Sequence, residues 1–265
     1  MTAGTVRGIR YAAMCQRLGT EQRGAFIPFA MLGDPDPTRS LTLLRTLAPA
    51  GADALELGLP FSDPVADGPV IQAAGTRALA AGVTRADCWS LVTTIRAEFP
   101  ELPIGLLVYA NLVCHREPSV FYAGAAAAGV DSVLVADLPV LESAPIAEAA
   151  RAAGVAPVYI APPNADPARL NRIARAGEGY TYVTSREGVT GADQRLQRDQ
   201  SALIRMLMEF GAPPPVLGFG ISRPEHVRAA IKMGARGAIS GSAVVSLAAS
   251  GGDVGGFVRV MKAAT

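Results

Sequence analysis

The sequence predicts an α/β fold, a single (β/α)8 TIM barrel over residues 1–265 with a short extra N-terminal helix. Two observations support this prediction. Eight short runs of β-forming residues alternate with Ala-rich helical stretches, which is typical of parallel βαβ units. The length of 265 residues also suits one barrel of this kind. No Ser/Gly-rich linker or break in composition indicates a second domain.

The predicted elements follow one another in a regular order. Strands are expected at 25–31, 53–58, 104–108, 132–135, 156–160, 180–183, 216–218 and 237–239. Helical patterns lie between them, at 38–50, 119–128, 142–153, 167–176, 200–210 and 224–233. The alternative is an open doubly wound sheet. The absence of a GxGxxG motif after the first strand weighs against a dinucleotide-binding version of that sheet.

A repeated glycine marks where helices end and strands begin. Gly51, Gly129, Gly154 and Gly234 each follow a helical stretch and precede a strand, in the segments AGAD, AGVD, AGVAP and MGARGA. Glycine adopts the left-handed conformation after a helix without strain. The recurrence of this signal supports a repeated βα unit.

Composition limits the classes of function. The chain has 24 basic and 23 acidic residues and a net charge of +1, so no nucleic-acid footprint is indicated. The three cysteines, Cys15, Cys88 and Cys114, form no CxxC pair, which argues against a disulfide framework or a zinc module. The first residues lack the apolar core of a signal peptide, and no segment is typical of a membrane span. We expect a cytoplasmic enzyme or binding protein.

Glycines after the last two strands predict a phosphate site. Gly218 and Gly220 follow the seventh strand, and Gly241 and Ser242 follow the eighth. In TIM barrels these loops and a helix N-terminus commonly hold phosphate through backbone N–H groups. Ser242 is expected to cap the helix that starts there. The alternative is that these are ordinary turn glycines, and a phosphate site alone does not distinguish among phosphosugar enzymes.

Carboxylates after the second strand are candidates for acid–base chemistry. Glu56 interrupts an apolar strand, where a carboxylate is costly unless it is paired or functional. Partial burial would raise its pKa toward neutrality, whereas an arginine on a neighbouring strand would make it structural. Asp63 and Asp67 follow in a loop rich in Pro and Gly, where aspartates also serve as turn or cap residues.

The residues that are scarce exclude other mechanisms. Lys232 and Lys262 are the only lysines, and both lie in late helical segments, so a Schiff-base lysine inside the barrel is not expected. The two histidines, His115 and His226, lack metal-ligand spacing, and no metal is expected. We expect His115 at the rim and His226 on an exposed helix face. Once Schiff-base and metal mechanisms are set aside, the sequence favours acid–base catalysis by carboxylates on a phosphorylated substrate.

Several blocks resemble the tryptophan synthase alpha-subunit family. They include ADALELGLPFSDPVADGPVIQ, PIGLLVYANLV, GVDSVLVADLP, APPNAD, GYTYVTSREGVTGA, LGFGIS and GAISGSAVV, and the resemblance covers most of the chain. It implies a carbon–carbon lyase that cleaves indole-3-glycerol phosphate to indole and glyceraldehyde 3-phosphate. No cofactor is implied for this chain. Met31 departs from the family pattern, which usually has Thr there.

The resemblance also implies roles for individual residues. Glu56 matches the general acid and Asp67 the second catalytic carboxylate. The pKa of Glu56 should then be raised by apolar surroundings and that of Asp67 left low by polar ones. The implied substrate-binding residues are Phe29, Leu107, Tyr109, Leu134, Ile160, Tyr182, Thr190, Gly191, Phe219, Gly220, Gly241 and Ser242.

A partner is implied by the same resemblance. It is a pyridoxal-phosphate-dependent beta subunit in an αββα assembly, which receives indole through a tunnel. Rim residues suited to contact are Pro60, Asp63, Asn111, Leu112 and Pro139. Three alternatives stay open: a chain that acts mainly as an allosteric and channelling partner with weak catalysis of its own, a lyase that works without a partner, and a generic phosphosugar isomerase.

Overall fold

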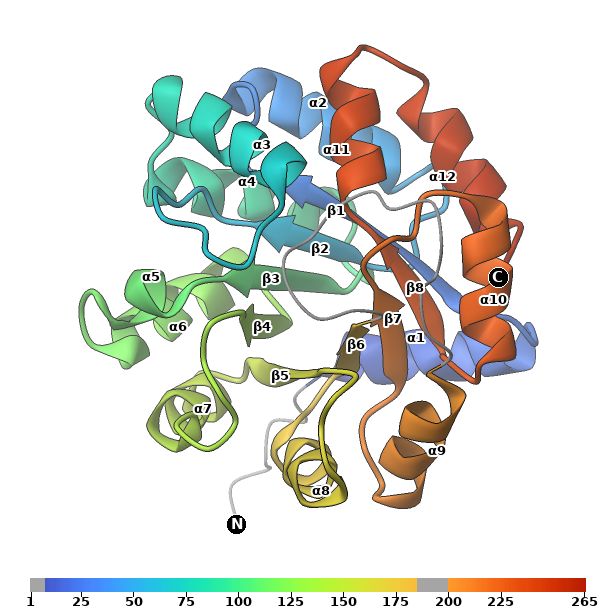
Figure 1. Cartoon of the computed structure of the whole chain (residues 1–265). Helices are drawn as coiled ribbons and strands as arrows, with labels where there is room; N and C mark the ends of the chain where they lie inside the picture. The colour runs from blue at the N-terminus through green and yellow to red at the C-terminus, as the bar shows by residue number, and fades with distance from the viewer. Residues whose placement is uncertain (1–7, 185–199) are drawn as a thin grey trace.

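Eight parallel strands close into a barrel in the computed structural model, which describes residues 8–184 and 200–265. Each strand pairs with the next along the chain, and the eighth pairs with the first (Figure 1). The strands are β1 (Ala25–Met31), β2 (Leu55–Gly58), β3 (Ile104–Val108), β4 (Ser132–Val135), β5 (Ala156–Ala161), β6 (Thr181–Thr184), β7 (Pro215–Gly218) and β8 (Gly237–Ser240). This closure confirms the predicted TIM barrel and rules out the open sheet.

Helices surround the barrel (Figure 1). They are α1 (Ile9–Thr20), α2 (Pro37–Leu47), α3 (Pro69–Ala80), α4 (Arg85–Glu98), α5 (Ala110–Cys114), α6 (Pro118–Ala128), α7 (Ala144–Ala152), α8 (Pro167–Ala176), α9 (Ser201–Glu209), α10 (Pro224–Lys232), α11 (Ser242–Ala249) and α12 (Val254–Lys262). The six predicted helices are confirmed, with ends shifted by up to about three residues, as is usual for helix boundaries. Sequence patterns had not singled out α3, α4, α5 and α12, and they had indicated only the start of α11 near Ser242. Helices α3 and α11 pack on β1 and on each other, so apolar residues spread around them and blur the helical period.

The glycine signal between helices and strands is confirmed. Gly51, Gly129, Gly154 and Gly234 have φ angles of 113°, 93°, 81° and 98°. These values lie in the left-handed region that other residues adopt only with strain. The chain can therefore reverse direction within a few residues after each of these helices.

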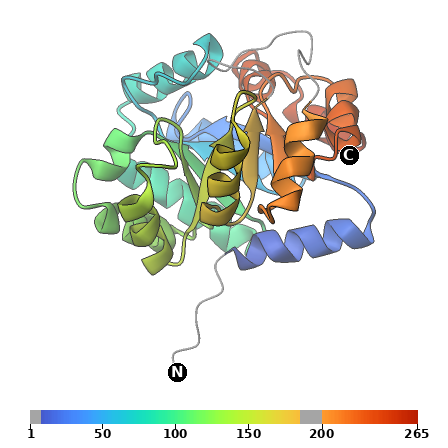
Figure 2. The same cartoon turned by 60° about the horizontal axis from the view of Figure 1, so that its bottom comes forward.

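The inside of the barrel is filled by side chains, and α1 closes its N-terminal end. Tyr11, Met14 and Leu18 of α1 pack against inward-facing residues such as Ile27 and Val216. The Tyr11 hydroxyl lies 2.9 Å from the Ser132 hydroxyl oxygen inside the barrel. Figure 2 shows α1 lying across this end, apart from the ring of outer helices. The extra N-terminal helix therefore leaves only the opposite end open.

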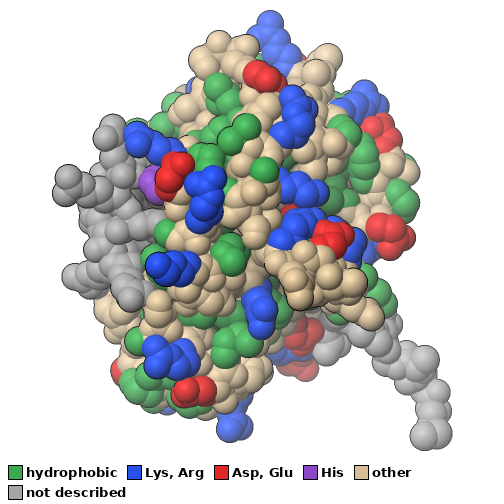
Figure 3. Space-filling model, turned by 90° about the vertical axis from the view of Figure 1, so that its right-hand side faces the viewer, with side chains coloured by type: hydrophobic (Ala, Val, Ile, Leu, Met, Phe, Trp, Pro, Cys, Tyr) green, Lys and Arg blue, Asp and Glu red, His purple; other side chains and the backbone are tan. Residues whose placement is uncertain are grey.

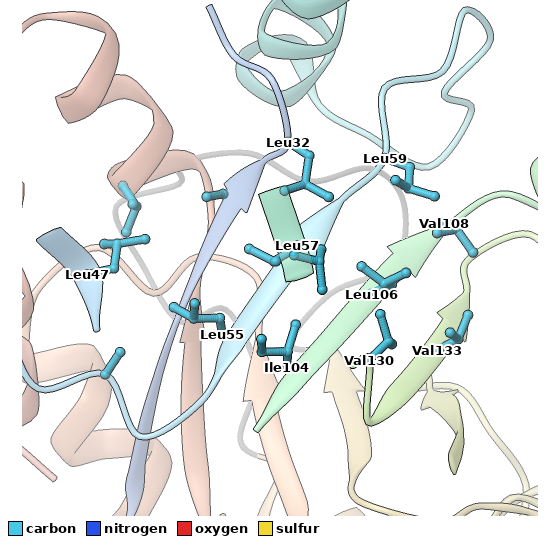
Figure 4. Packing of buried hydrophobic residues seen from close by; sticks show 14 of the residues in the cluster. Leu32, Leu47, Leu55, Leu57, Leu59, Ile104, Leu106, Val108, Val130 and Val133 are labelled. Atoms are coloured by element: carbon cyan, nitrogen blue, oxygen red, sulfur yellow. The ribbon is translucent and has the colours of Figure 1, made fainter. Parts of the chain in front are cut away.

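A second, larger core lies between the strands and the outer helices. Leu55, Leu57, Ile104 and Leu106 alternate along β2 and β3 with residues that face the barrel interior (Figure 4). All four are at most 1% exposed. Burial on both sides of the strands holds β2 rigidly, and this strand carries Glu56.

Charges of both signs are interspersed on the face formed by α10 and α12 (Figure 3). Arg228 pairs with Glu225, and Arg259 lies 3.9 Å from Asp253. Opposite charges in such proximity do not form the continuous basic surface that a nucleic acid requires. In the described segments, no helix combines the length and apolar character needed to cross a bilayer.

Candidate active site

A pocket of about 490 Å³ opens at the C-terminal end of the barrel, opposite α1. The residues that line it are Phe29, Glu56, Asp67, Ile71, Leu107, Tyr182, Phe219, Gly220, Ile221, Ser222, Ile239, Gly241, Ser242 and Ala243.

The sequence predicted fourteen site residues, two carboxylates and twelve substrate-binding residues, and nine of the fourteen line the pocket. The nine are both carboxylates and seven of the twelve substrate-binding residues. The lining residues that sequence reasoning missed are Ile71, Ile221, Ser222, Ile239 and Ala243. Four of these, Ile221, Ser222, Ile239 and Ala243, lie within the motifs LGFGIS and ISGSA, so the motifs themselves were the available signal.

Glu56 lies at the bottom of this pocket on β2. In the strand register it stands between Phe29 of β1 and Gly105 of β3, and its side chain is 2% exposed. The Tyr180 hydroxyl donates a hydrogen bond of 2.7 Å to Glu56 Oε1. Burial raises the pKa of Glu56 to about 7. The Tyr180 hydrogen bond lowers this pKa, but by less than burial raises it. Among the described residues no arginine pairs with Glu56, so the structural alternative of an ion pair is wrong.

Asp67 lies in the loop between β2 and α3 and also faces the pocket. It is 5% exposed, the Tyr109 hydroxyl donates a hydrogen bond to its carboxylate, and its carbonyl oxygen accepts from Gln72 Nε2 at 2.7 Å. Burial raises the pKa of Asp67 to about 6, although the Tyr109 hydrogen bond lowers it. The expectation that polar surroundings leave this pKa low is therefore wrong, because loss of water outweighs the one hydroxyl donor. The pKa of Glu56 is still the higher of the two.

Apolar side chains form the walls between the carboxylates and the pocket mouth. Phe29, Leu107, Tyr182 and Phe219 line the pocket, and the rings of Tyr182 and Phe219 meet edge to face at 5.8 Å. A Cβ at Gly218 would overlap the Tyr182 ring, so glycine is required there to admit this tyrosine. A flat aromatic ligand matches such a lining.

Three further predicted residues lie near the pocket without lining it. Tyr109 is buried and bonded to Asp67, and its ring stacks on Phe61 at 5.3 Å. Leu134 and Ile160 belong to the cluster of inward-facing residues that fills the barrel. Tyr109 therefore touches the carboxylate rather than the open space, and the other two support the pocket from within the barrel.

The opposite wall of the pocket is built from backbone at the ends of β7 and β8. Gly220, Gly241 and Ser242 line it, and α11 begins at Ser242. Gly241 takes the cap position and no side chain caps this helix, so the expected capping by Ser242 is wrong. Ser242 therefore lines the pocket without capping the helix, and it lies at a helix N-terminus, which favours anions.

The predicted substrate-binding residues Thr190 and Gly191, and Met31, which departs from the family pattern, are not among the described residues that line the pocket. Thr190 and Gly191, together with Gly188 of the same segment, lie outside the described residues. Met31 is 5% exposed and packs with Phe29, Ile71 and Ala74 beside the pocket. Its side chain therefore supports the start of α3, which follows the loop that carries Asp67, by apolar contact.

Comparisons with known proteins identify the family of this chain. The family model described as tryptophan synthase alpha chain matches residues 15–254. A tryptophan synthase alpha chain from Shewanella oneidensis is 57% identical over 264 residues, which cover 97% of this chain and 95% of the relative. Both matches extend over almost the whole barrel.

Solved structures give the same result. A structure of Mycobacterium tuberculosis tryptophan synthase aligns with a TM-score of 0.87 at 27% identity, over 96% of this chain and 97% of that one. A structure of the tryptophan synthase a2b2 complex from Pyrococcus furiosus aligns with a TM-score of 0.82 at 35% identity, over 89% of this chain and 95% of that one. The chain therefore belongs to the tryptophan synthase alpha chain family.

Proposed function

We propose that Glu56 and Asp67 carry out the reaction of this family in the pocket at the C-terminal end of the barrel. As a member of the family, the chain is a lyase that cleaves indole-3-glycerol phosphate to indole and glyceraldehyde 3-phosphate. The observation that carries the assignment of residues is the pair of buried carboxylates, which face one apolar pocket and have raised pKa values. Perturbed carboxylates in a cleft are typical of acid–base sites.

Glu56 acts as the general acid. A pKa of about 7 leaves a substantial fraction of this carboxyl protonated near neutral pH, which a proton donor requires. It protonates carbon 3 of the indole ring, and the ring nitrogen then becomes an iminium that accepts the electrons of the breaking bond. After this transfer the Glu56 carboxylate is free to take the proton of the side-chain hydroxyl. The substrate itself supplies the electron sink.

Asp67 stabilises the positive charge that develops on the indole ring. With a pKa of about 6 it is mostly ionised near neutral pH, while Glu56 still holds a proton. The Tyr109 hydroxyl donates a hydrogen bond to this carboxylate and so stabilises its charged form. A fixed negative charge in a dry site stabilises a developing cation strongly. Because the pKa of Glu56 is higher than that of Asp67, Glu56 can serve as the acid while Asp67 is the anion near neutral pH.

The remaining contacts divide the substrate between two walls. The indole ring lies among Phe29, Leu107, Tyr182 and Phe219, with Leu134 and Ile160 behind them. The phosphate lies against the backbone of Gly220 and Gly241 and the Ser242 hydroxyl. The start of α11 at this wall supports the phosphate assignment, because unpaired N–H groups and the helix dipole favour an anion. Thr190 and Gly191, which the resemblance also implies as substrate-binding residues, lie outside the described residues.

The product indole is passed to a beta subunit, the partner of this family. The Pyrococcus furiosus structure is described as a mutually activating a2b2 complex, and we infer the same αββα assembly here. Asp63, in the loop after β2, and Asn111, in α5 after β3, are exposed, as residues that contact a partner must be. A role as mainly an allosteric partner is less well supported, because both carboxylates are in place to react.

We also infer that residues 1–265 form one domain and that the protein is cytoplasmic. The closed barrel with helices from Ile9 to Lys262 supports the single domain. The cytoplasmic location rests on the family resemblance.

The test is indole release from indole-3-glycerol phosphate by the purified chain, with and without a beta subunit. We expect slow release alone, faster release with the partner, and collapse of both in Glu56→Gln. Full activity in that variant would contradict the role of Glu56. No release by the wild-type chain in either condition, with the partner's own reaction still stimulated, would favour the allosteric alternative.

A further inference from the structure

The loop Phe219–Ser222, between β7 and α10, is held from behind by two side chains that do not line the pocket. The Ser240 hydroxyl donates a hydrogen bond of 2.6 Å to the carbonyl oxygen of Ile221. The Nδ1 atom of His226 accepts a hydrogen bond of 3.3 Å from the backbone N–H of Ser222. All four loop residues line the pocket. We call Ser240 and His226 the two braces of this loop. Both bind the backbone of the pocket wall to which the proposed function assigns the phosphate and part of the indole ring.

This loop has a backbone conformation that needs support. Phe219 has a φ of 64° and Gly220 a φ of 73°. A left-handed conformation is strained for a side chain such as Phe and persists only when the surroundings enforce it. Loss of a brace should therefore let the loop relax away from the geometry that the pocket requires.

His226 is suited to be one of these braces. It is 8% exposed, so the expectation of an exposed helix residue is wrong. As the third residue of α10, it reaches back toward the chain that precedes the helix, as acceptors at this position do in capping boxes. The Ser222 hydroxyl lies 3.5 Å from the same ring nitrogen. To accept the backbone N–H, Nδ1 must carry no proton.

We propose that His226 is a positioning residue that holds the loop Phe219–Ser222 in the conformation that receives the phosphate end of the substrate. The proposal rests on the proposed function, since that function places the phosphate against Gly220. His226 acts through the Ser222 backbone and touches no substrate. Its loss should weaken substrate binding more than it slows the chemical step, because Glu56 and Asp67 lie on other loops and strands.

A pair of variants separates this role from a general effect on α10. His226→Asn places an acceptor at the same distance from the backbone as Nδ1, whereas His226→Leu has the same branching and no acceptor. Asn is a poorer helix former than Leu. A merely structural role would therefore harm the Asn variant more, and a bracing role would harm the Leu variant more. Lys232→Leu introduces the same residue at an exposed position of the same helix and serves as the control.

Two readouts are measured for each variant: kcat and KM for indole release with a beta subunit, and the Kd of glycerol 3-phosphate by calorimetry. For His226→Leu we expect KM and Kd to rise about fivefold, the effect of one lost hydrogen bond, with kcat changed little. His226→Asn and Lys232→Leu should stay close to the wild type. If the Leu variant does not fold, His226→Ala replaces it.

Equal values for the Asn and Leu variants, or a larger loss in Asn, would overturn the proposal. The binding readout also separates it from the proposed function. If the wild-type chain binds glycerol 3-phosphate but releases no indole, the proposed function fails, and the Kd series alone decides the role of His226. If the wild-type chain does not bind glycerol 3-phosphate, the proposal is overturned, because there is no phosphate for the loop to receive.

Discussion

The two ends of the barrel treat buried carboxylates in opposite ways. Asp53, at the N-terminal end just before β2, is 2% exposed and accepts hydrogen bonds of 2.8 Å from both terminal nitrogens of Arg23 and of 3.0 Å from the Phe26 N–H. Burial acts to raise the pKa of Asp53, but these bonds outweigh it and the pKa is lowered. Glu56, on β2 and equally buried, accepts a hydrogen bond from the Tyr180 hydroxyl and pairs with no arginine among the described residues, and its pKa is raised.

The hydrogen-bond partners of Asp131 and Asp67 differ in the same way. Asp131, just before β4, accepts from Arg96 at 2.6 Å, from Arg10 at 2.8 Å and from the Ile104 N–H at 2.8 Å. Asp67, at the other end, accepts a hydrogen bond from the Tyr109 hydroxyl, and no arginine among the described residues pairs with it. At the end closed by α1, arginine partners offset the desolvation penalty of the buried carboxylates. At the end with the pocket, tyrosine hydroxyls offset less of that penalty. In this fold the N-terminal end usually serves stability and the C-terminal end chemistry, and the partners of these carboxylates match that division.

The largest expected effect is the loss of activity in Glu56→Gln. Removal of a positioned proton donor should lower kcat about 100- to 10,000-fold. The free energy of unfolding should not fall, because the amide is neutral and keeps an acceptor for Tyr180. Indole release and thermal unfolding measured on the same preparation check both parts. A variant that loses activity only because it unfolds would remove the contrast between the two ends.

The pH dependence of stability should have opposite signs at the two ends. Glu56 has a raised pKa in the folded state, so the folded chain keeps a proton that the unfolded chain releases. Between pH 4.5 and about 7 this group therefore destabilises the fold as pH rises, on the order of 3 kcal/mol in total. The stability supplied by Asp53 is present above pH 3.8 and is lost as pH falls through its lowered folded pKa.

Denaturant unfolding of the wild type and Glu56→Gln across this range tests the sign. The wild type should lose stability relative to the variant as pH rises from 4.5 to about 7. A constant difference between the two proteins would show that the pKa of Glu56 is not raised by folding.

Asp53→Asn should lower stability and spare catalysis. The amide cannot neutralise Arg23, and we expect the free energy of unfolding to fall by about 2 kcal/mol, with kcat close to that of the wild type. Chemical denaturation gives the first quantity and indole release the second. This is the same type of change as Glu56→Gln, three residues away, so it is the matched control for that variant. A large loss of kcat without loss of stability would contradict the division between the ends.

The smallest expected effect is that of Tyr180→Phe. Its hydroxyl lowers the pKa of Glu56, so its removal should raise that pKa further. The alkaline limb of the pH profile of kcat, which we expect near pH 7 in the wild type, should then move to higher pH. The loss in stability should be about 1 kcal/mol. An unchanged limb would show that this hydrogen bond does not set the pKa of Glu56.

Local sequence patterns were sufficient for the fold and for nine of the residues that line the pocket. The alternation of strands and helices, and glycines such as Gly51 and Gly129 before new strands, are encoded within a few neighbouring residues. The residues that follow parallel strands must meet at one end of a closed barrel, so Glu56, Gly220 and Gly241 could be grouped before their contacts were known. The motifs that resemble a known family then supplied the reaction.

Tertiary structure alone decided the electrostatics and the supporting contacts. The partner of Glu56 is Tyr180, 124 residues away, where an arginine had been an open alternative. The pKa of Asp67 is raised and His226 is buried, both against expectation. A pKa depends on how much water and which charges surround a group, and a brace depends on an atom within about 3 Å. These neighbours come from distant parts of the chain, so no local pattern of residues can specify them.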